Sequence, residues 1–426
     1  MAAAGLITAG STPAKPDYPF EAGEEYYGNY DLPGGKILGG GPFEVPGTLL
    51  FLEATELKDG GLFDKTDTPD FYKEHYQPAR TLRFKRGPKG GVIGLYYDSG
   101  DGHEVYAKKE PLTLSHVTFK DGDTVLGGNL FLPAGKGPHP AVVFINGSGD
   151  THREIGQLAP FFLQCGMAVL SYDKRGVGGS QGKWLDGSYK VLAEDALAGV
   201  KFLAGRADID KKRIGLLGSS EGGWVAPIAG ARSPLVSFMM VRVGPGQPAP
   251  ETTLFERMND MKAAGYSEDV IKPYLAMWRK IYDQAKDGAS FEEMQKKVVD
   301  PVRGEAWFKT VYKDGGQPFG KGAYWPWTVK NANIDPVDYI SKLDIPILWF
   351  LAEKDINVDT KASIPRLEAA FDKASTNDTT LVVLPNVGHT FIVRNDKGQP
   401  IGITQGYYDR MAAWLKARGF WGKSSK

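Results

Sequence analysis

The fold of this chain is decided by residues 213–224, RIGLLGSSEGGW, where an apolar run leads into a Gly-x-Ser-x-Gly motif centred on Ser220. The apolar run predicts a buried strand, and the small residues that follow predict a helix packed close against it. A serine at such a strand-to-helix turn sits on a strained backbone that exposes its hydroxyl group. Ser220 is therefore the candidate nucleophile.

The same motif occurs a second time, in GGSQG around Ser180. This serine follows YDKRGVGG and precedes QGKWLDGS, a stretch with too many turn residues to start a helix at once. We interpret Ser180 as a loop serine.

A serine hydroxyl is an effective nucleophile only when a base takes its proton and a third group orients that base. His389 is the only histidine after Ser220, and the chain order serine, acid, histidine is the order found around this turn. The run PILWFLAEKDINVD offers Glu353, Asp355 and Asp359 as acids. A position on the loop just past the strand favours Asp355. The other two acids remain alternatives, and capping of the next helix remains an alternative role for Asp355.

Two backbone N–H groups are expected to face the substrate beside the nucleophile, because preorganised amide donors stabilise the charge of a tetrahedral intermediate. Glu221, the residue after Ser220, supplies one such amide in this kind of turn. The loop after AVVFIN contains Gly147 and Ser148 and leaves the same end of the sheet. We favour the N–H of Ser148, with Gly147 as its neighbour.

Apolar strands and helical segments alternate from residue 112 onward, which predicts a mostly parallel sheet with helices on both faces. A hairpin that turns at KDGD opens this part of the chain. The expected strands are 141–146, 167–173, 213–219, 235–243, 346–353 and 379–385. The expected helices lie near 155–165, 189–205, 221–231, 360–373 and 405–418.

Two regions depart from this alternation. Residues 1–111 consist of short aromatic or β-branched runs between Gly, Pro and Asp turns, which predicts a small antiparallel β domain. Residues 112–426 then form the catalytic domain. Within them, residues of about 245–335 have helical patterns and an aromatic, Gly-rich stretch, and we expect a helical cap over the carboxyl edge of the sheet.

We assign substrate choice to this cap. Trp325 and Trp327 lie in the turn-rich stretch AYWPWT and are the candidate substrate-binding residues, although aromatic residues at such spacings equally suit core packing. No arginine or lysine of the cap stands out as a clamp for a carboxylate or phosphate. For the N-terminal β domain, packing against the cap as a stabiliser is favoured over binding a glycan or polymer.

Composition limits the partners. Lys plus Arg equals Asp plus Glu, at 51 each among 426 residues, so the charge gives no indication of nucleic acid or an anionic membrane surface. The only cysteine, Cys165, lies in an apolar run and reads as a buried small side chain. The N-terminal MAAAGLITAG lacks a basic segment and a long apolar run. We expect a soluble protein with no membrane insertion, either cytoplasmic or exported with its signal peptide removed.

The motifs FINGSGD, LSYDKRGVGGS, IGLLGSSEGGWVAP, LAEKDINV and PNVGHTF together resemble the α/β-hydrolase superfamily, specifically bacterial serine esterases of the dienelactone-hydrolase-like group. The resemblance covers roughly residues 115–420 and implies the α/β-hydrolase fold, with Ser220, Asp355 and His389 as the catalytic triad. It also implies that Asp173 and Arg175 are scaffold residues beneath the site. The N-terminal part is similar to small β-meander domains that accompany serine hydrolases.

The sequence departs from this family at Ser219, where many relatives carry His, Phe or another large residue. The effect of this difference on the pocket stays open.

We therefore expect a serine hydrolase that cleaves small to medium carboxylic esters, aryl esters included, through an acyl-serine intermediate. The partner is a small-molecule ester. No cofactor and no metal are expected, because the histidines and the cysteine lack ligand spacing. A thioesterase or acyl-amide hydrolase would use the same triad. A non-catalytic binding protein on the hydrolase fold is the alternative from another class.

Overall fold

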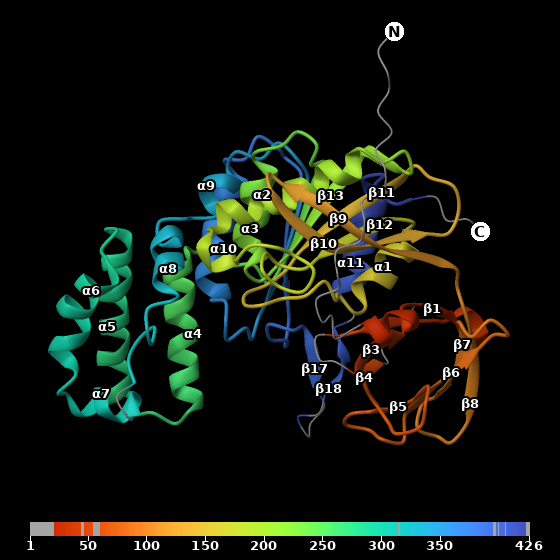
Figure 1. Ribbon diagram of the computed structural model, residues 1–426, viewed down its shortest axis with the longest axis horizontal. Helices are drawn as coiled ribbons and strands as arrows, with labels where there is room; N and C mark the ends of the chain where they lie inside the picture. Colours follow the sequence, from red (N-terminus) through yellow and green to blue (C-terminus); the bar gives the residue numbers. More distant parts are fainter. Residues whose placement is uncertain are drawn as a thin grey trace, which may run out of the picture.

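The computed structural model describes residues 21–43, 47–53, 60–313, 316–394, 398, 400–404 and 406–422. Three parts are visible in Figure 1: a β barrel, a central sheet with helices on both faces, and a group of helices on the side of the sheet away from the barrel. The expected α/β-hydrolase architecture is confirmed, and the N-terminal region is an antiparallel barrel.

The barrel closes because its last strand pairs antiparallel with its first, with Lys109 opposite Tyr30. Its interior is filled by side chains, among them the fully buried Tyr30, Phe51 and Phe63. A 3₁₀ helix, Glu21–Tyr26, precedes it. The barrel strands are β1 (Gly28–Asp31), β2 (Ile37–Pro42), β3 (Thr48–Glu53), β4 (Gly60–Lys65), β5 (Phe71–Glu74), β6 (Thr81–Arg86), β7 (Val92–Asp98) and β8 (Glu104–Lys109).

The central sheet has the strand order β16-β15-β14-β13-β11-β12-β10-β9. From β12 to β16 all neighbours are parallel, and the β9–β10 hairpin joins this sheet antiparallel. The strands are β9 (Leu112–Asp121), β10 (Thr124–Pro133), β11 (His139–Ile145), β12 (Ala168–Tyr172), β13 (Ile209–Ser219), β14 (Phe238–Arg242), β15 (Ile347–Ala352) and β16 (Thr379–Leu384). The parallel strands are mainly apolar because both faces of the sheet are covered.

Two apolar cores form, one on each face of the sheet. One contains side chains of α2 (Tyr189–Ala204), α3 (Gly222–Gly230) and α10 (Thr360–Phe371). The other contains side chains of α1 (Leu158–Gln164) and α11 (Gly406–Ala417). The predicted strands and helices of this part are therefore confirmed, with small differences at their ends.

The helical insertion follows β14 and has an apolar core of its own, which includes Trp278, Ile281 and Phe308. Its helices extend away from the sheet, whereas the barrel lies near the other side of the molecule (Figure 1). The insertion comprises α4 (Ala249–Ala263), α5 (Glu268–Lys286), α6 (Phe291–Met294), a π turn (Gln295–Val299), a 3₁₀ turn (Asp300–Val302), α7 (Ala306–Val311) and α8 (Trp325–Asn331), and α9 (Val337–Ile340) leads back to the sheet.

A small hairpin, β17 (Ile392–Arg394) and β18 (Pro400–Ile403), follows the last sheet strand and contacts β4 of the barrel. It lies between the sheet and the barrel in Figure 1. Within the described ranges, no helix is both long enough and apolar enough to cross a membrane.

Candidate active site

Ser220 lies between β13 and α3 with a backbone φ of 53°, in the left-handed region that a non-glycine residue rarely adopts. Two glycines make the turn possible. A Cβ atom on Gly218 would lie 2.3 Å from the carbonyl oxygen of Gly222, and one on Gly222 would lie 2.6 Å from that of Ile145. The small residues of the motif therefore let the turn close, and the serine is held at its apex.

The structure brings together the three side chains that the sequence singled out. His389 Nε2 lies 3.0 Å from Ser220 Oγ, and His389 Nδ1 lies 2.8 Å from Asp355 Oδ2. The Asp355 side chain is fully buried, and its Oδ1 accepts the backbone N–H groups of Asn357 and Val358 at 2.9 and 3.0 Å. These amides fix the carboxylate, which in turn orients the imidazole toward the serine.

The two alternative acids have other partners. Glu353 accepts the backbone N–H of Asn386 at 2.8 Å. Asp359 is the N-cap of α10 and accepts the N–H of Ala362 at 3.0 Å. The capping role that the sequence left open for Asp355 therefore belongs to Asp359.

A buried ion pair joins the two segments that carry the expected amide donors. Lys174 Nζ lies 2.7 Å from Glu221 Oε1 and donates to the carbonyl oxygen of Gly147 at 2.7 Å. A Cβ atom on Gly147 would lie 3.5 Å from Ser220 Cβ, so this loop passes close to the serine. In the described part of the chain, the N–H groups of Glu221 and Ser148 have no protein acceptor. Lys174 was missed, although it stands in the motif YDKRG.

A cavity of about 510 Å³ opens beside Ser220 and His389. Its walls come from the barrel, the loop between β11 and α1, the β17–β18 hairpin with α11, and the carboxyl ends of β13 and β14, where Arg242 and Val243 lie. The barrel contributes Phe43, Leu50, Leu52, Leu62 and Tyr76, among others. None of the described residues of the helical insertion lines this cavity.

Comparison with known proteins decides the family. The sequence profile of the family described as "Serine aminopeptidase, S33" matches residues 136–397, which is more than half of the chain. The chain belongs to this family. It is an α/β hydrolase.

Two curated relatives and one solved structure are similar to this α/β hydrolase. Esterase EstD of Thermotoga maritima is 24% identical over 361 residues, which cover 79% of this chain and 78% of EstD. The 2,6-dihydropseudooxynicotine hydrolase of Paenarthrobacter nicotinovorans is 36% identical over 96 residues, 22% of this chain and 24% of that enzyme. The structure of the Pyrococcus furiosus esterase Pf2001 matches with a TM-score of 0.47 at 16% identity. The match covers 73% of this chain and 92% of the esterase chain.

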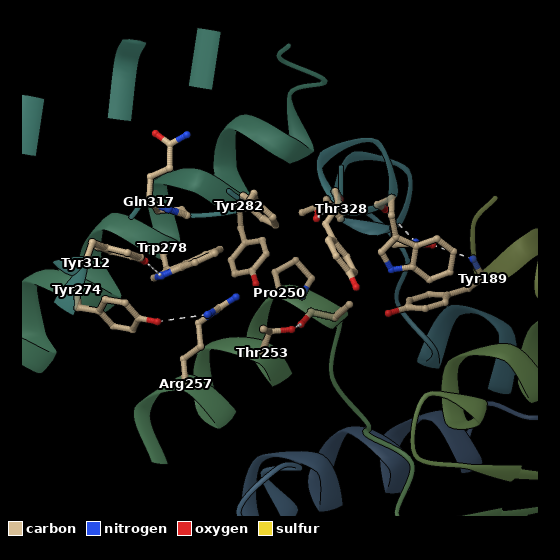
Figure 2. A pocket seen from close by; sticks show the side chains of 17 residues that line it. Tyr189, Pro250, Thr253, Arg257, Tyr274, Trp278, Tyr282, Tyr312, Gln317 and Thr328 are labelled. Atoms are coloured by element: carbon tan, nitrogen blue, oxygen red, sulfur yellow. Dashed lines mark hydrogen bonds between the residues drawn. The ribbon is translucent and has the colours of Figure 1, made fainter. Parts of the chain in front are cut away.

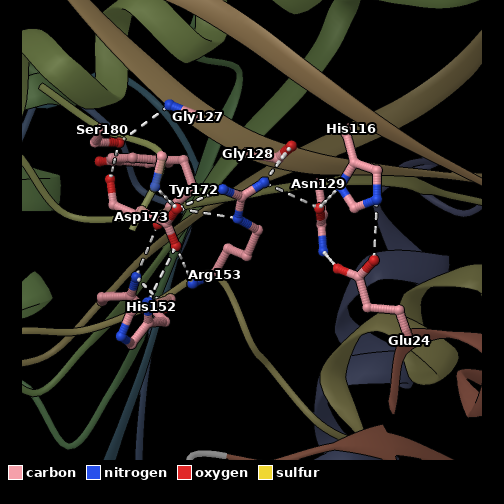
Figure 3. A network of polar contacts seen from close by, with 12 residues as sticks. Glu24, His116, Gly127, Gly128, Asn129, His152, Arg153, Tyr172, Asp173 and Ser180 are labelled. Atoms are coloured by element: carbon pink, nitrogen blue, oxygen red, sulfur yellow. Dashed lines mark hydrogen bonds and ion pairs between the residues drawn. The ribbon is translucent and has the colours of Figure 1, made fainter. Parts of the chain in front are cut away.

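Ser180, the serine of the second motif, forms hydrogen bonds with the backbone of two neighbouring segments in this α/β hydrolase. Ser180 Oγ donates to the carbonyl oxygen of Asp173 at 2.7 Å and accepts the N–H of Gly127 at 3.0 Å. Asp173, fully buried, also binds the guanidinium group of Arg153, and the network continues through Asn129 toward Glu24 (Figure 3). Burial alone would raise the pKa of Asp173, but hydrogen bonds from His152, from Arg153 and from the N–H of Gly179, with the charge of Arg153, hold it below its usual range.

Arg175, the other expected scaffold residue, forms ion pairs with Asp121 and Asp195. These carboxylates come from the edge hairpin and from α2. The motif YDKRG therefore ties the loop after β12 to both neighbouring elements.

The two tryptophans expected to bind substrate lie elsewhere in this α/β hydrolase. Trp325 is buried in the core of the insertion, and its Nε1 donates to the carbonyl oxygen of Ala289 at 2.9 Å. Trp327 packs edge-on against Trp184 and Tyr189, with ring centroids 5.0 and 5.3 Å away. Neither side chain reaches the cavity at Ser220 because the insertion extends away from the barrel side of the sheet.

Two polar residues of the cavity wall were not predicted from the sequence. Glu154 and Gln157 are 6% and 1% exposed, and their side-chain oxygens, with Gln157 Nε2, have no hydrogen-bond partner on another described residue. Burial, with a smaller contribution from the Asp173 carboxylate, raises the pKa of Glu154 to about 9. Glu154 is therefore a neutral acid at neutral pH, able to donate and to accept a hydrogen bond.

No metal site accompanies these residues in the described ranges, where no group of three or more His, Cys, Asp or Glu side chains could hold an ion. Cys165 is buried, and burial raises the pKa of its thiol, so it is a core residue.

Proposed function

We propose that this hydrolase cleaves carboxylic esters by acyl transfer to Ser220. The observation that supports the proposal best is the continuous hydrogen-bonded chain from Ser220 Oγ through His389 to the Asp355 carboxylate, at 3.0 and 2.8 Å. An imidazole in this position takes the serine proton as the hydroxyl attacks the ester carbonyl, and the buried carboxylate stabilises the imidazolium ion.

The amides of Glu221 and Ser148 are the proposed donors to the oxyanion, and Lys174 positions both segments. Collapse of the intermediate expels the alcohol, which takes the proton from His389. Water then enters, loses its proton to the same histidine and releases the acid, so that Ser220 is regenerated. Every step uses side chains and amides of this chain.

The substrate part that fills the cavity is proposed to be mainly apolar with a neutral polar group. Leucines 50, 52 and 62 of the barrel supply apolar wall. Glu154 and Gln157 offer buried donors and acceptors that a hydroxyl, carbonyl or amide group of the substrate would satisfy. The likeness to esterase EstD over most of both chains favours an ester over an amide.

Labelling with a fluorophosphonate tests the nucleophile. We expect one adduct on the peptide that holds Ser220, absent in Ser220→Ala and retained in Ser180→Ala, by intact mass and peptide mapping. No adduct, or an adduct on Ser180, contradicts the proposal. An ester and an anilide with the same acyl group, compared by kcat/KM, then separate esterase from amidase activity.

A further inference from the structure

A second cavity, of about 440 Å³, lies within the helical insertion and shares no lining residue with the cavity at Ser220. Its walls come from α4, α5, α8, the segment between α7 and α8, and the first residue of α2. Aromatic side chains dominate them, as Figure 2 shows. They include Tyr189, Tyr274, Trp278, Tyr282, Tyr312, Phe319 and Trp327.

One cation, Arg257 on α4, points into this aromatic cavity. Its guanidinium carbon lies 3.4 Å from the ring centroid of Trp278, and its Nη1 donates to the Tyr274 hydroxyl at 3.2 Å (Figure 2). The hydroxyl of Tyr282 also interacts with it. The buried Nε has no hydrogen-bond acceptor among the described residues.

Two acidic residues near Arg257 in the sequence have other partners, and the described Asp260, three residues further along α4, forms no ion pair with Arg257 within 4.0 Å. Glu256 Oε1 accepts a hydrogen bond from the Asn357 side-chain amide at 2.7 Å. Glu251 forms an ion pair with Arg279 on the surface, with 3.2 Å between Oε1 and Nη1. No described carboxylate forms an ion pair with Arg257 within 4.0 Å. The guanidinium group has a tryptophan ring and neutral hydroxyl groups as partners, so no carboxylate balances its positive charge, and its Nε–H has no acceptor among the described residues.

We infer that this cavity is a binding site for a small aromatic carboxylate. The planar guanidinium group of Arg257 matches a carboxylate in a bidentate pair, which a neutral ligand would not provide. The Tyr274 and Tyr282 hydroxyls lie beside it as further donors. The rings of the walls suit a flat aromatic body, and the volume lies in the range of small-molecule pockets. The sequence alone did not single out Arg257, and its proposed role as a carboxylate clamp rests on these contacts.

The site stands independently of the hydrolytic proposal, because neither Ser220 nor His389 lines it. The two regions are connected by ring packing and by hydrogen bonds. The ring of Tyr189 stacks on Trp224 of α3, with centroids 5.0 Å apart and planes 8° apart, and the Asn259 side chain of α4 donates to the carbonyl oxygen of Ile356, next to Asp355, at 2.7 Å. Tryptophans in the cavity wall make binding visible by fluorescence.

Titration of the full-length protein with 2-naphthoate, followed by tryptophan fluorescence and calorimetry, tests the site. We expect saturable binding with a Kd at least about tenfold lower than for neutral 2-naphthamide. Arg257→Gln should raise the Kd by about tenfold or more, whereas Arg279→Gln, which removes an exposed arginine of α5, should leave it unchanged. Thr328→Trp keeps the arginine and fills the cavity, and it should also abolish binding.

Three results would overturn the inference: no saturable binding by the wild type, equal affinity for the naphthamide, or binding that Arg257→Gln and Thr328→Trp both leave intact. Thr328→Trp tests the location of the ligand even where Arg257→Gln fails to fold. Since the readout is binding, failure of Ser220 labelling has no bearing on the result.

Discussion

The barrel and the helical insertion are both additions to the same central sheet, yet only the barrel borders the cavity at Ser220. The insertion encloses a separate cavity with Arg257 in its wall. In chain order the insertion is the closer of the two, because it begins soon after β14, the strand that follows the Ser220 turn. Which addition borders the site is therefore decided by where it docks on the sheet, and not by its distance from the nucleophile along the chain.

The docking contacts of the barrel explain its position. Asn29 donates to the carbonyl oxygen of Pro160 at 3.1 Å and accepts from Gln164 at 2.8 Å, both on α1. Tyr27 packs edge-on against Phe131 and accepts the N–H of Ile155 through its hydroxyl group. These hydrogen bonds surround the ring contact between Tyr27 and Phe131, and together they hold the barrel against α1 and the loop that precedes it. That loop carries both the proposed oxyanion amide and the unpartnered polar residues.

The largest expected effect tests whether the chemistry lies on the barrel side. Asp355→Asn keeps the shape of the side chain but removes the charge that stabilises the imidazolium ion, and should lower kcat by about 10³- to 10⁴-fold. Glu353→Gln alters the neighbouring acid, which only accepts a loop amide, and serves as the matched control with kcat within about twofold. Comparable losses in both variants would show that Asp355 is not the orienting acid.

A smaller loss is expected from the ion pair that links the two oxyanion segments. Lys174→Met leaves the Glu221 carboxylate buried and unpaired, which should lower the free energy of unfolding by about 3–5 kcal/mol. It should also lower kcat by about ten- to a hundredfold, because the amides lose their alignment.

The double variant Lys174→Met/Glu221→Leu separates stability from positioning. We expect its melting temperature to recover, since no charge stays buried alone, while kcat stays low with KM little changed. Recovery of kcat together with stability would reduce Lys174 to a purely structural role.

The sequence predicted best those site residues whose position depends on the strand that precedes them in the chain. The turn at Ser220, the acid past β15 and the histidine past β16 each stand directly after an apolar run, so strand ends place them at one edge of the sheet. Asp355 could be preferred over its two neighbours on the same ground. The contacts of Glu353 and Asp359 became known only from the structure.

Other features depend on docking between distant segments. Glu154 and Gln157 belong to the polar stretch THREIGQ, whose composition is typical of an exposed loop. In the folded protein the barrel lies against this stretch, and both side chains are buried. Arg257 has acidic neighbours in the sequence, and only the structure shows that Glu256 binds Asn357 and that the ring of Trp278 lies against the Arg257 guanidinium group. Trp325 and Trp327 were assigned to the substrate pocket because the insertion was expected to cover the sheet edge. No periodicity reports which side of the sheet an insertion occupies.

The next prediction sharpens the contrast between the two cavities. Leu62→Trp enlarges a side chain of β4 in the wall beside Ser220 and should lower kcat/KM for long-acyl esters about tenfold relative to acetate esters. Val105→Trp, on the exposed side of β8, is the barrel control and should leave the ratio unchanged. The affinity for 2-naphthoate should be the same in Leu62→Trp as in the wild type. A weakened affinity would place that ligand in the barrel-side cavity.

The contribution of Glu154 to stability depends on pH, and this dependence is expected without any change in the catalytic groups. Its pKa is raised from 4.5 to about 9 in the folded protein, so the folded chain keeps a proton that the unfolded chain releases. Stability from this group is complete below the unfolded pKa and is lost as the pH rises toward 9. Glu154→Gln cannot ionise, so its free energy of unfolding should gain on that of the wild type between pH 5 and 9, by at most about 1.4 kcal/mol per pH unit, and its melting temperature should rise relative to the wild type in the same direction.

Glu293→Gln on the insertion provides the opposite case for this measurement. The capping box with Ser290 lowers the pKa of Glu293, so its contribution is present above the unfolded pKa and is lost only as the pH falls through the folded value. Its difference from the wild type should therefore be constant between pH 5 and 9. Melting curves of Glu154→Gln that run parallel to the wild type over this interval would mean that Glu154 ionises in the folded protein as freely as in the unfolded chain. The barrel would then leave water at this wall, and the neutral polar subsite proposed for the substrate would be lost with it.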